Sequence, residues 1–420
     1  MMMVIMDAKP MADQPGCKTP AALQSETIRI MPQAASATSS PQRLMQLDLI
    51  RAAAILLVLV NHTPFLDISS TGQKQLAFLT PLFRMGEVGV PLFFVLSGFL
   101  IGGLLLNETT RTRSLAPGRF LIRRGFKIYP PFYLTILAYA GYLHFFEGSL
   151  NLERFAREIF FLQNYGVGGL IDVSWSLAVE EHFYFLFAFI ATWLVRRQQH
   201  KADESGQAFA LRVFKPVAVL ALILMGACWI WRCAAFLPMG DREIAAISPT
   251  PQTHFRIDAL FAGAALAWLW FSGWNPRVLS HAWVRLPLLL MAAATLALNA
   301  IPSSQLSLQF KKTHYLLMLT LAAASLIWLS LRWKPGENPL WSVLAAIGRH
   351  SYCIYLVHVP LFRLLNKVIA DRFDGWHGLA HAAIAWTAAV LAGMLMTRVV
   401  ETPSLRLRDR WFPPSGLKKS

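Results

Sequence analysis

The chain alternates between long apolar stretches and short connections that are polar and mostly basic. About twenty mostly apolar residues are enough to cross a bilayer as a helix. Ten segments fit this description, at residues 47–66, 87–106, 128–146, 175–195, 214–237, 255–272, 284–301, 314–331, 344–365 and 379–399. The pattern predicts an all-α protein, a polytopic transmembrane helix bundle of about ten spans.

The Lys and Arg residues of the connections predict the orientation of this bundle. The link 107–127 carries six basic residues and one acid, 196–213 carries four basic residues, and 400–420 carries five. Ten spans place all three on the cytoplasmic side, with both termini cytoplasmic. Lys311 and Lys312 do not fit this orientation, because it places them outside. These two residues are fewer than the fifteen basic residues of the three cytoplasmic connections.

Composition agrees with a membrane protein. Hydrophobic residues make up 55% of the 420 residues and charged residues 15%, whereas about 25% charged residues is usual for a soluble domain. The net charge of +16 would suit a nucleic-acid partner, but the basic residues lie between apolar blocks, so we expect none. The four cysteines lack zinc-site spacing, and neither a metal site nor a disulfide framework is expected.

The two ends of the chain differ from its middle. Residues 1–43 are rich in Ala, Ser, Gln and Pro without an apolar period, which predicts a disordered cytoplasmic tail. Translation beginning nearer Met31 or Met45 is the alternative. A transmembrane domain is expected over 44–411, followed by a basic C-terminal tail at 412–420.

The first apolar segment carries ionisable groups where lipid is expected. Arg51 and His62 are eleven residues apart, which places them within about 20° of one helix face and about 16 Å apart along the axis. Asp48 precedes Arg51 by three residues and can pair with it. Ionisable groups inside spans are costly and usually functional. The alternative is an interfacial Asp48–Arg51 anchor, with His62 a satisfied polar contact.

The second apolar segment begins GEVGVPLFFVLSGFLIGG, from Gly86. Its glycines let backbones or a ligand approach closely, and Gly98 and Gly102 form a small-xxx-small motif that helix packing alone would explain. Glu87 and Ser97 are less easily assigned to packing. Ser97 can donate a hydrogen bond to a carbonyl or bond back to the preceding helical turn.

A basic cluster follows this segment. Arg119, Arg123 and Arg124 stand at i, i+4 and i+5, just before an aromatic-rich span. Guanidinium groups at helical spacing suit phosphate recognition through bidentate, charge-assisted hydrogen bonds. The alternative is a topology signal with contacts to lipid head groups.

Further polar groups interrupt the later spans. Glu180, Glu181 and His182 are consecutive and spread over about 200° of helix, so they cannot share one neighbour. At least one carboxylate is expected to face a polar interior, because lipid exposure is costly. Polar contacts within the bundle are the alternative for a further set. This set comprises Arg256, Asp258, Arg349, His350, Ser351, Tyr352, Tyr355 and His358.

Six blocks of this sequence resemble acyltransferase family 3, the integral-membrane O-acyltransferases that modify surface polysaccharides, lipopolysaccharide, peptidoglycan and some small molecules. The blocks are LDLIR…NH (48–62), VGVPLFFVLSGFLI (88–101), RFLIRRGFKIYPPFY (119–133), WSLAVEEHFY (175–184), IGRHSYCIYLVH (347–358) and ETPSLRLRDR (401–410). The resemblance covers about 47–411. Leu49 stands where the family usually has Gly, and His182 where it commonly has Gln.

The resemblance implies an activity. The donor would be cytoplasmic acyl-CoA, most often acetyl-CoA, used as a co-substrate and not as a bound cofactor. The acceptor would be a hydroxyl of a cell-surface glycan or its lipid-linked precursor, and the enzyme would lie in a bacterial inner membrane. We expect no fused extracellular hydrolase-like domain of the kind some members carry, which leaves open whether a partner completes the transfer. The oligomeric state is left open too.

The resemblance also implies roles for the residues above. His62 would be the general base on the acceptor hydroxyl or would itself carry the acyl group, and Arg51 would hold the donor or stabilise developing negative charge. Glu180 or Glu181 would orient an imidazole. The groups expected to bind the donor are Arg119, Arg123, Arg124 and Ser97. Asp48 and His358 would support the site.

Two other functions fit parts of the pattern. A polytopic transporter or flippase of a glycan or anionic substrate would use the same basic entry and intramembrane charges, although the chain has no repeat typical of duplicated halves. Acylation of a small molecule would use the same fold and motifs. A thioester-dependent acyl-transfer assay separates the transporter from either enzyme.

Overall fold

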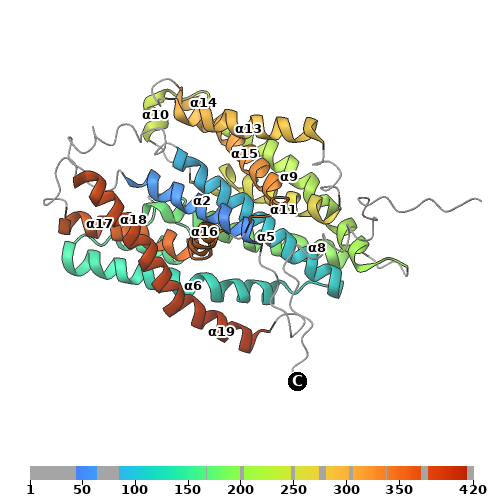
Figure 1. Ribbon diagram of the computed structural model, residues 1–420, viewed down its shortest axis with the longest axis horizontal. Coiled ribbons are helices and arrows are strands. Elements are labelled where there is room, and N and C mark those ends of the chain that lie inside the picture. The colour runs from blue at the N-terminus through green and yellow to red at the C-terminus, as the bar shows by residue number, and fades with distance from the viewer. Residues whose placement is uncertain are drawn as a thin grey trace, which may run out of the picture.

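The computed structural model describes nine stretches of the chain. They are residues 44–63, 85–166, 168–198, 203–246, 251–273, 281–301, 306–336, 338–369 and 377–413. The regular structure in these stretches is helical throughout (Figure 1). The tail expected at 1–43 and residues 414–420 of the expected basic tail lie outside the described residues.

Every segment predicted to span the membrane contains a helix. The longer helices are α2 (Met45–Asn61), α5 (Gly89–Thr112), α6 (Pro117–Tyr142), α8 (Trp175–Arg197), α9 (Gly206–Phe236), α11 (Ile257–Phe271), α13 (Ala282–Ala300), α15 (His314–Ser330), α17 (Ser351–Ile369) and α18 (His377–Met396). Shorter elements are η3 (Gly86–Val88), η4 (Leu143–Glu147), α7 (Leu152–Ile159), η5 (Asp172–Ser174), α10 (Asp241–Ala246), η6 (Thr253–Phe255), α14 (Leu308–Lys312), α16 (Pro339–Arg349), η9 (Thr397–Glu401) and α19 (Thr402–Trp411).

The prediction of ten spans is confirmed only in part. Within the described residues, four helices are long and apolar enough to cross a membrane, or five if one bent pair counts as a span. The four are Gly86–Thr112, Asp172–Arg197, Gly206–Phe236 and Ala380–Trp411. Three further apolar helices are shorter, and the 15 residues of α11 rise only about 22 Å against about 30 Å of hydrocarbon. Hydropathy located these segments but did not give their lengths.

Two segments differ in shape from the prediction. The ninth is broken at His350, where α16 and α17 meet at 69°. The tenth does not end near residue 399, because the helix continues without a break through η9 and α19 to Trp411. The polar residues of α19 are accommodated beside α6, since Arg123 pairs with Asp409 at 3.2 Å.

Helix α5 packs against α11 more closely than side chains would permit. A Cβ added at Gly98 would lie 1.8 Å from the carbonyl oxygen of Leu260, and one at Gly263 would lie 2.0 Å from that of Val95. A Cβ added at Gly102 would lie 3.0 Å from the Cα of Ala264, which also belongs to α11. These glycines of α5 therefore serve helix packing, as small-xxx-small motifs do.

The core of the described residues forms two large clusters and a small third one around Phe236, Ile244 and Phe255. One cluster joins α5, α8, α9, α11 and α15, and the other joins α6, α17 and α18 with one face of α2. Figure 1 shows α13, α14 and α15 along one side of the bundle and α6, α18 and α19 along the other, with α2, α5 and α16 between them.

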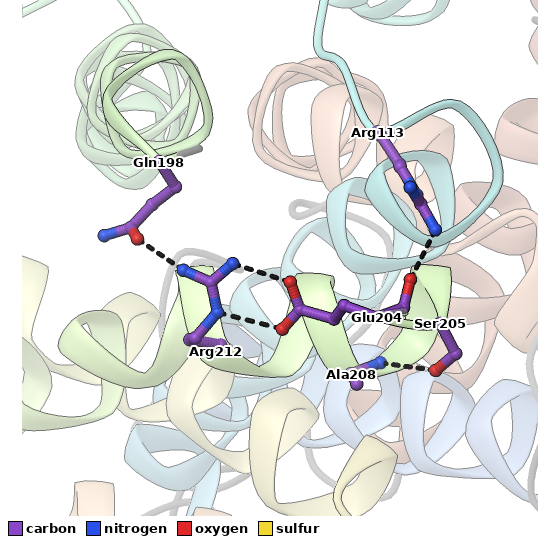
Figure 2. A network of polar contacts seen from close by, with 6 residues as sticks. All are labelled: Arg113, Gln198, Glu204, Ser205, Ala208 and Arg212. Atoms are coloured by element: carbon purple, nitrogen blue, oxygen red, sulfur yellow. Dashed lines mark hydrogen bonds and ion pairs between the residues drawn. The ribbon is translucent and has the colours of Figure 1, made fainter. Parts of the chain in front are cut away.

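The three basic connections lie at one end of the bundle. Arg113, in the link after α5, donates to the carbonyl oxygen of Glu204 in the link after α8 (Figure 2). Arg212 of α9 holds both carboxylate oxygens of Glu204, at 2.9 and 2.6 Å, and the side chain of Gln198. Arg123, which lies in the predicted link 107–127 and in the first turns of α6, also contacts the C-terminal segment by pairing with Asp409. The expected shared side of these links is thus supported by direct contacts.

Candidate active site

A cavity of about 130 Å³ opens between α2, α5, α6, α8 and the α16–α17 bend. We call it the Arg51 chamber. Its polar and charged lining residues are Arg51, Ser97, Arg124, Lys127, Ser176, Glu180, Glu181, Tyr184, Arg349, Ser351, Tyr352 and Tyr355. Four of these are cations and two are carboxylates, so the lining carries an excess of positive charge.

Arg51 is held at this chamber by its neighbour on α2. Its guanidinium lies 2.8 Å from Oδ1 of Asp48, whose side chain is buried. The predicted pairing of the two residues is confirmed. Gly348 fixes α16 against the same turn, because a Cβ there would lie 1.8 Å from the carbonyl oxygen of Asp48.

A relay of hydroxyl groups crosses the chamber from α5 to α8. The Tyr184 hydroxyl donates to Oε2 of Glu180 at 2.7 Å, so the hydroxyl of Ser97, also 2.7 Å away, donates to Tyr184. The guanidinium carbon of Arg124 lies 5.7 Å from the centre of the Tyr184 ring, a cation–π distance. Four residues from three helices are thereby held in one arrangement.

The three consecutive polar residues of α8 contact three different partners, as their angular spread predicts. Glu180 accepts from Tyr184, while Glu181 accepts from the Tyr129 hydroxyl at 3.1 Å. His182 lies 2.6 Å from the hydroxyl of Thr253. Both carboxylates line the Arg51 chamber, and His182 is directed to the segment that precedes α11.

A second, larger cavity of about 980 Å³ lies at the opposite end of α2. We call it the His62 chamber. Besides His62, its polar and charged lining residues are Asn61, Glu87, Arg154, Gln163, Asp172, Gln252, Arg256, Lys311, Lys312, Tyr315 and Tyr355. The walls come from α2, α5 and α15 and from the connections between helices at this end.

Two histidines meet beside this chamber. Nδ1 of His358 lies 2.6 Å from the carbonyl oxygen of Tyr355, and its Nε2 lies 3.3 Å from Nδ1 of His62. Nδ1 of His62 also lies 2.8 Å from the carbonyl oxygen of Val58. Because a carbonyl oxygen only accepts, these contacts assign a proton to Nδ1 of each neutral ring. Nε2 of His62 is then the ring nitrogen with a lone pair for proton abstraction or nucleophilic attack.

Val90 and Tyr355 line both chambers and so stand between them. The Tyr355 hydroxyl donates to the carbonyl oxygen of Val173 and accepts from Ser176, each at 2.7 Å. The hydroxyl of this side chain is therefore fixed, and the backbone carbonyl of the same residue anchors His358. Arg51 and His62 face the two chambers from opposite ends of one helix.

The expected donor-binding residues are not all brought together. Ser97 and Arg124 line the Arg51 chamber, whereas Arg119 and Arg123 are not among the described residues that line it. Arg123 instead contacts Asp409 and the carbonyl oxygen of Phe412. A donor role for Arg119 and Arg123 stays a prediction.

Several residues in or beside the chambers are not predicted as site residues from the sequence. Tyr184 and Trp175 line the chambers, and Tyr129 donates a hydrogen bond to the lining residue Glu181, but aromatic residues in an apolar helix usually indicate packing. Lys127 was counted only for topology. Lys311 and Lys312, the pair that disagreed with the expected topology, line the His62 chamber. That disagreement was the available signal. Within the described residues, no group of three His, Cys, Asp or Glu side chains is arranged to hold a metal ion.

The fold and the two chambers define a polytopic helical protein with polar groups held inside its bundle. This chain belongs to acyltransferase family 3, because residues 45–398 match the acyltransferase domain of that family. The expected resemblance is thus confirmed over most of the chain. No solved structure matches it.

Curated relatives carry O-acetyltransferase names. The chain is 26% identical over 382 residues to the peptidoglycan O-acetyltransferase OatA of Listeria monocytogenes, covering 85% of this chain and 55% of the relative. It is 24% identical over 407 residues to the O-acetyltransferase OatA of Staphylococcus aureus strain MRSA252, covering 91% and 60%. A putative O-acetyltransferase of S. aureus strain COL is 28% identical over 382 residues, covering 85% and 56%. The chain therefore spans a little over half the length of these relatives.

Proposed function

We propose that this protein is an O-acyltransferase that moves an acetyl group from cytoplasmic acetyl-CoA to a hydroxyl of a cell-surface glycan or its lipid-linked precursor, in a bacterial inner membrane. The donor enters the Arg51 chamber, and the acceptor enters the His62 chamber. Family membership supports the reaction class, and the peptidoglycan O-acetyltransferase name of one relative supports a glycan acceptor.

The observation that carries this proposal is the paired arrangement of the chambers. A cavity with excess positive charge suits the phosphates of CoA, and it shares Val90 and Tyr355 with a larger cavity that His62 lines. A thioester arm and a hydroxyl arriving from opposite ends would meet near these shared residues. The basic links gathered at the Arg51 end support its cytoplasmic orientation.

His62 supplies the proton transfer. Its Nε2 accepts the proton of the acceptor hydroxyl as the oxygen attacks the thioester carbonyl. A C–O bond forms, the C–S bond breaks, and the departing CoA thiolate takes the proton back from the imidazolium. The same nitrogen serves a two-step route. It first attacks the carbonyl carbon, and the C–S bond breaks to release CoA as the thiolate. The acceptor oxygen then takes the acetyl group from the imidazole, and the hydroxyl proton passes to the CoA thiolate.

The test uses the purified full chain in lipid nanodiscs with radiolabelled acetyl-CoA. We expect label to pass to an added glycan acceptor, with one free CoA released for each acetyl group transferred. Label trapped on the protein in the absence of acceptor would identify the two-step route. Mass spectrometry of surface glycans from a deletion strain should show loss of one acetyl mass per repeat unit. A chain that moves glycan across liposomes without consuming thioester would instead be a transporter.

A further inference from the structure

The His62 chamber carries a group of charged side chains that the proposed chemistry does not use. Its charged lining residues besides His62 are Glu87, Arg154, Asp172, Arg256, Lys311 and Lys312. The four cations come from three separate parts of the chain, namely α7, the residue before α11, and α14. Convergence of cations from unrelated segments on one cavity is not explained by the packing of any single helix.

Among the described lining residues, two carboxylates stand against four cations. Asp172 is already paired with Arg363, a residue outside the described lining of the chamber. Asp172, Glu87 and Arg154 are exposed, whereas the other three cations, Arg256, Lys311 and Lys312, are half-buried. The positive charge is therefore concentrated deeper in the chamber than the negative charge.

The pKa of Lys312 reflects this excess of positive charge. Burial and the nearby charge of Arg256 lower the pKa of Lys312 from about 10.5 to about 8, against the opposing effect of Glu87. A bound anion would favour the protonated form of this lysine. The guanidinium of Arg256 is itself positioned, because its central carbon lies 5.3 Å from the centre of the Trp175 ring.

Topology gives an independent reason to treat Lys311 and Lys312 as functional. The three connections rich in Lys and Arg lie together at the other end of the bundle, so these two lysines oppose the usual distribution of positive charge. Lysines at this end of the bundle hinder insertion in the expected orientation. Their presence in the wall of a large cavity is accounted for if they bind something.

We propose that the His62 chamber selects an acceptor glycan that bears an anionic group, a carboxylate or a phosphate, through Lys311, Lys312 and Arg256. This inference rests on the proposed function for the identity of the site, and it adds the acceptor class. The cations hold the anionic group, which positions a hydroxyl of the same or a neighbouring sugar toward His62.

The test measures binding and transfer separately, with the full chain in nanodiscs of neutral lipid. The probes are glucuronate-containing oligosaccharides, the same oligosaccharides with their carboxyl groups reduced to alcohols, and a sugar phosphate. Calorimetry without donor should show at least about tenfold tighter binding of the anionic probes, a ratio that corresponds to about 1.4 kcal/mol. Tighter binding of the sugar phosphate alone would identify the anionic group as a phosphate. Tighter binding of both the phosphate and the glucuronate probes would show that negative charge alone is recognised.

Matched variants test the named residues. K311Q/K312Q should reduce binding of the anionic probes to the level of the neutral ones and leave neutral binding unchanged. R332Q/K334Q removes two charges beyond the other end of α15 and should change neither. Wild-type protein that binds charged and reduced probes alike, or binds none, overturns the inference even if acetyl transfer occurs. Selective binding without any acetyl transfer would retain the anionic site and refute the proposed acyltransferase reaction.

Discussion

Nε2 of His358 lies 3.3 Å from Nδ1 of His62, although the two residues are 296 positions apart in the chain. His358 is fully buried and is held by the carbonyl oxygen of Tyr355. Through this contact α17 orients the ring at the end of α2, whose tautomer is set by the carbonyl oxygen of Val58. The pair resembles the general arrangement in which a reactive imidazole is oriented by a second group on its far nitrogen.

The first prediction concerns His62 itself. His62→Ala should insert at normal levels and lose acetyl transfer by roughly 10²–10⁴-fold, the usual effect of removing a general base. His62→Gln keeps polarity and some hydrogen bonding but no basic nitrogen, so it should be equally inactive. Turnover is measured as acetyl-CoA consumption by purified protein. Near-normal turnover of His62→Gln would leave His62 a polar packing residue and move the chemistry elsewhere.

The second prediction concerns His358 as a positioning residue. His358→Ala removes one of the two groups that contact Nδ1 of His62 and leaves the carbonyl oxygen of Val58 as the other. The loosened ring should lower kcat by roughly 10- to 100-fold. KM for acetyl-CoA should not change, because His358 is not among the described residues that line the Arg51 chamber. His358→Gln can still accept from His62 and should retain more activity than the alanine variant. Equal losses in the two variants, or a raised KM, would argue against positioning.

The sequence predicted the helices well and their shapes poorly. The pattern of apolar residues along the chain locates a helix in each predicted segment, because backbone groups in lipid must be paired internally. It does not reveal the bend at His350, since both sides of that bend are apolar. It also misplaced the last boundary, because the polar residues of α19 are stabilised by a contact to Arg123 that lies far away in the sequence.

The residues of the candidate site that the sequence predicts are those whose charge is unusual within an apolar helix. Arg51, Glu180 and Glu181 stood out as ionisable groups within apolar helices, and all three line one chamber. Arg123 and Arg124 were grouped by spacing, yet their side chains diverge because they are adjacent on α6. Tyr355 stood out as a polar residue within an apolar helix, but its partners did not, and Tyr184 was not recognised. The roles of both residues depend on tertiary partners from other helices.

The third prediction separates Arg123 from Arg124. Arg124→Gln should weaken acetyl-CoA binding by about tenfold or more, because a charge-assisted contact in the Arg51 chamber would be lost. Arg123→Gln removes the same charge one residue away and should weaken binding by less than about threefold, since Arg123 contacts the C-terminal segment. Donor affinity is measured by titration of protein in nanodiscs. Equal weakening by both variants would restore the sequence-based assignment of Arg123 to the donor site.

The fourth prediction concerns orientation. Thr112 and Ser307 are exposed residues at opposite ends of the bundle. Single cysteines at these positions, in a background without the four native cysteines, should react differently with a membrane-impermeant thiol reagent applied to intact cells. We expect Thr112→Cys to be protected and Ser307→Cys to be labelled. The reverse result would invert the proposed topology, and labelling of both in intact cells would contradict it.

The last prediction concerns Glu158 of α7, which anchors part of the wall of the His62 chamber. One carboxylate oxygen of this buried side chain accepts from the backbone N–H groups of Leu170 and Ile171, at 2.5 and 3.2 Å. A Cβ at Gly169 would lie 2.5 Å from the same oxygen, so the loop needs a glycine to approach it. Burial raises the pKa of Glu158 from about 4.5 to about 7, although the two backbone donors oppose the shift.

A carboxyl group whose pKa is higher in the folded state binds its proton more tightly there, so folding loses stability as the pH rises. The contribution of Glu158 should be fully present below about pH 4.5 and lost as the pH passes about 7. Glu158→Gln mimics the protonated group at every pH and keeps an oxygen for both backbone donors. The thermal midpoint of the variant relative to wild type should therefore rise between pH 5 and 8, when both are measured by scanning fluorimetry in the same detergent. A difference that stays constant over this range would show that Glu158 is ionised in the folded protein.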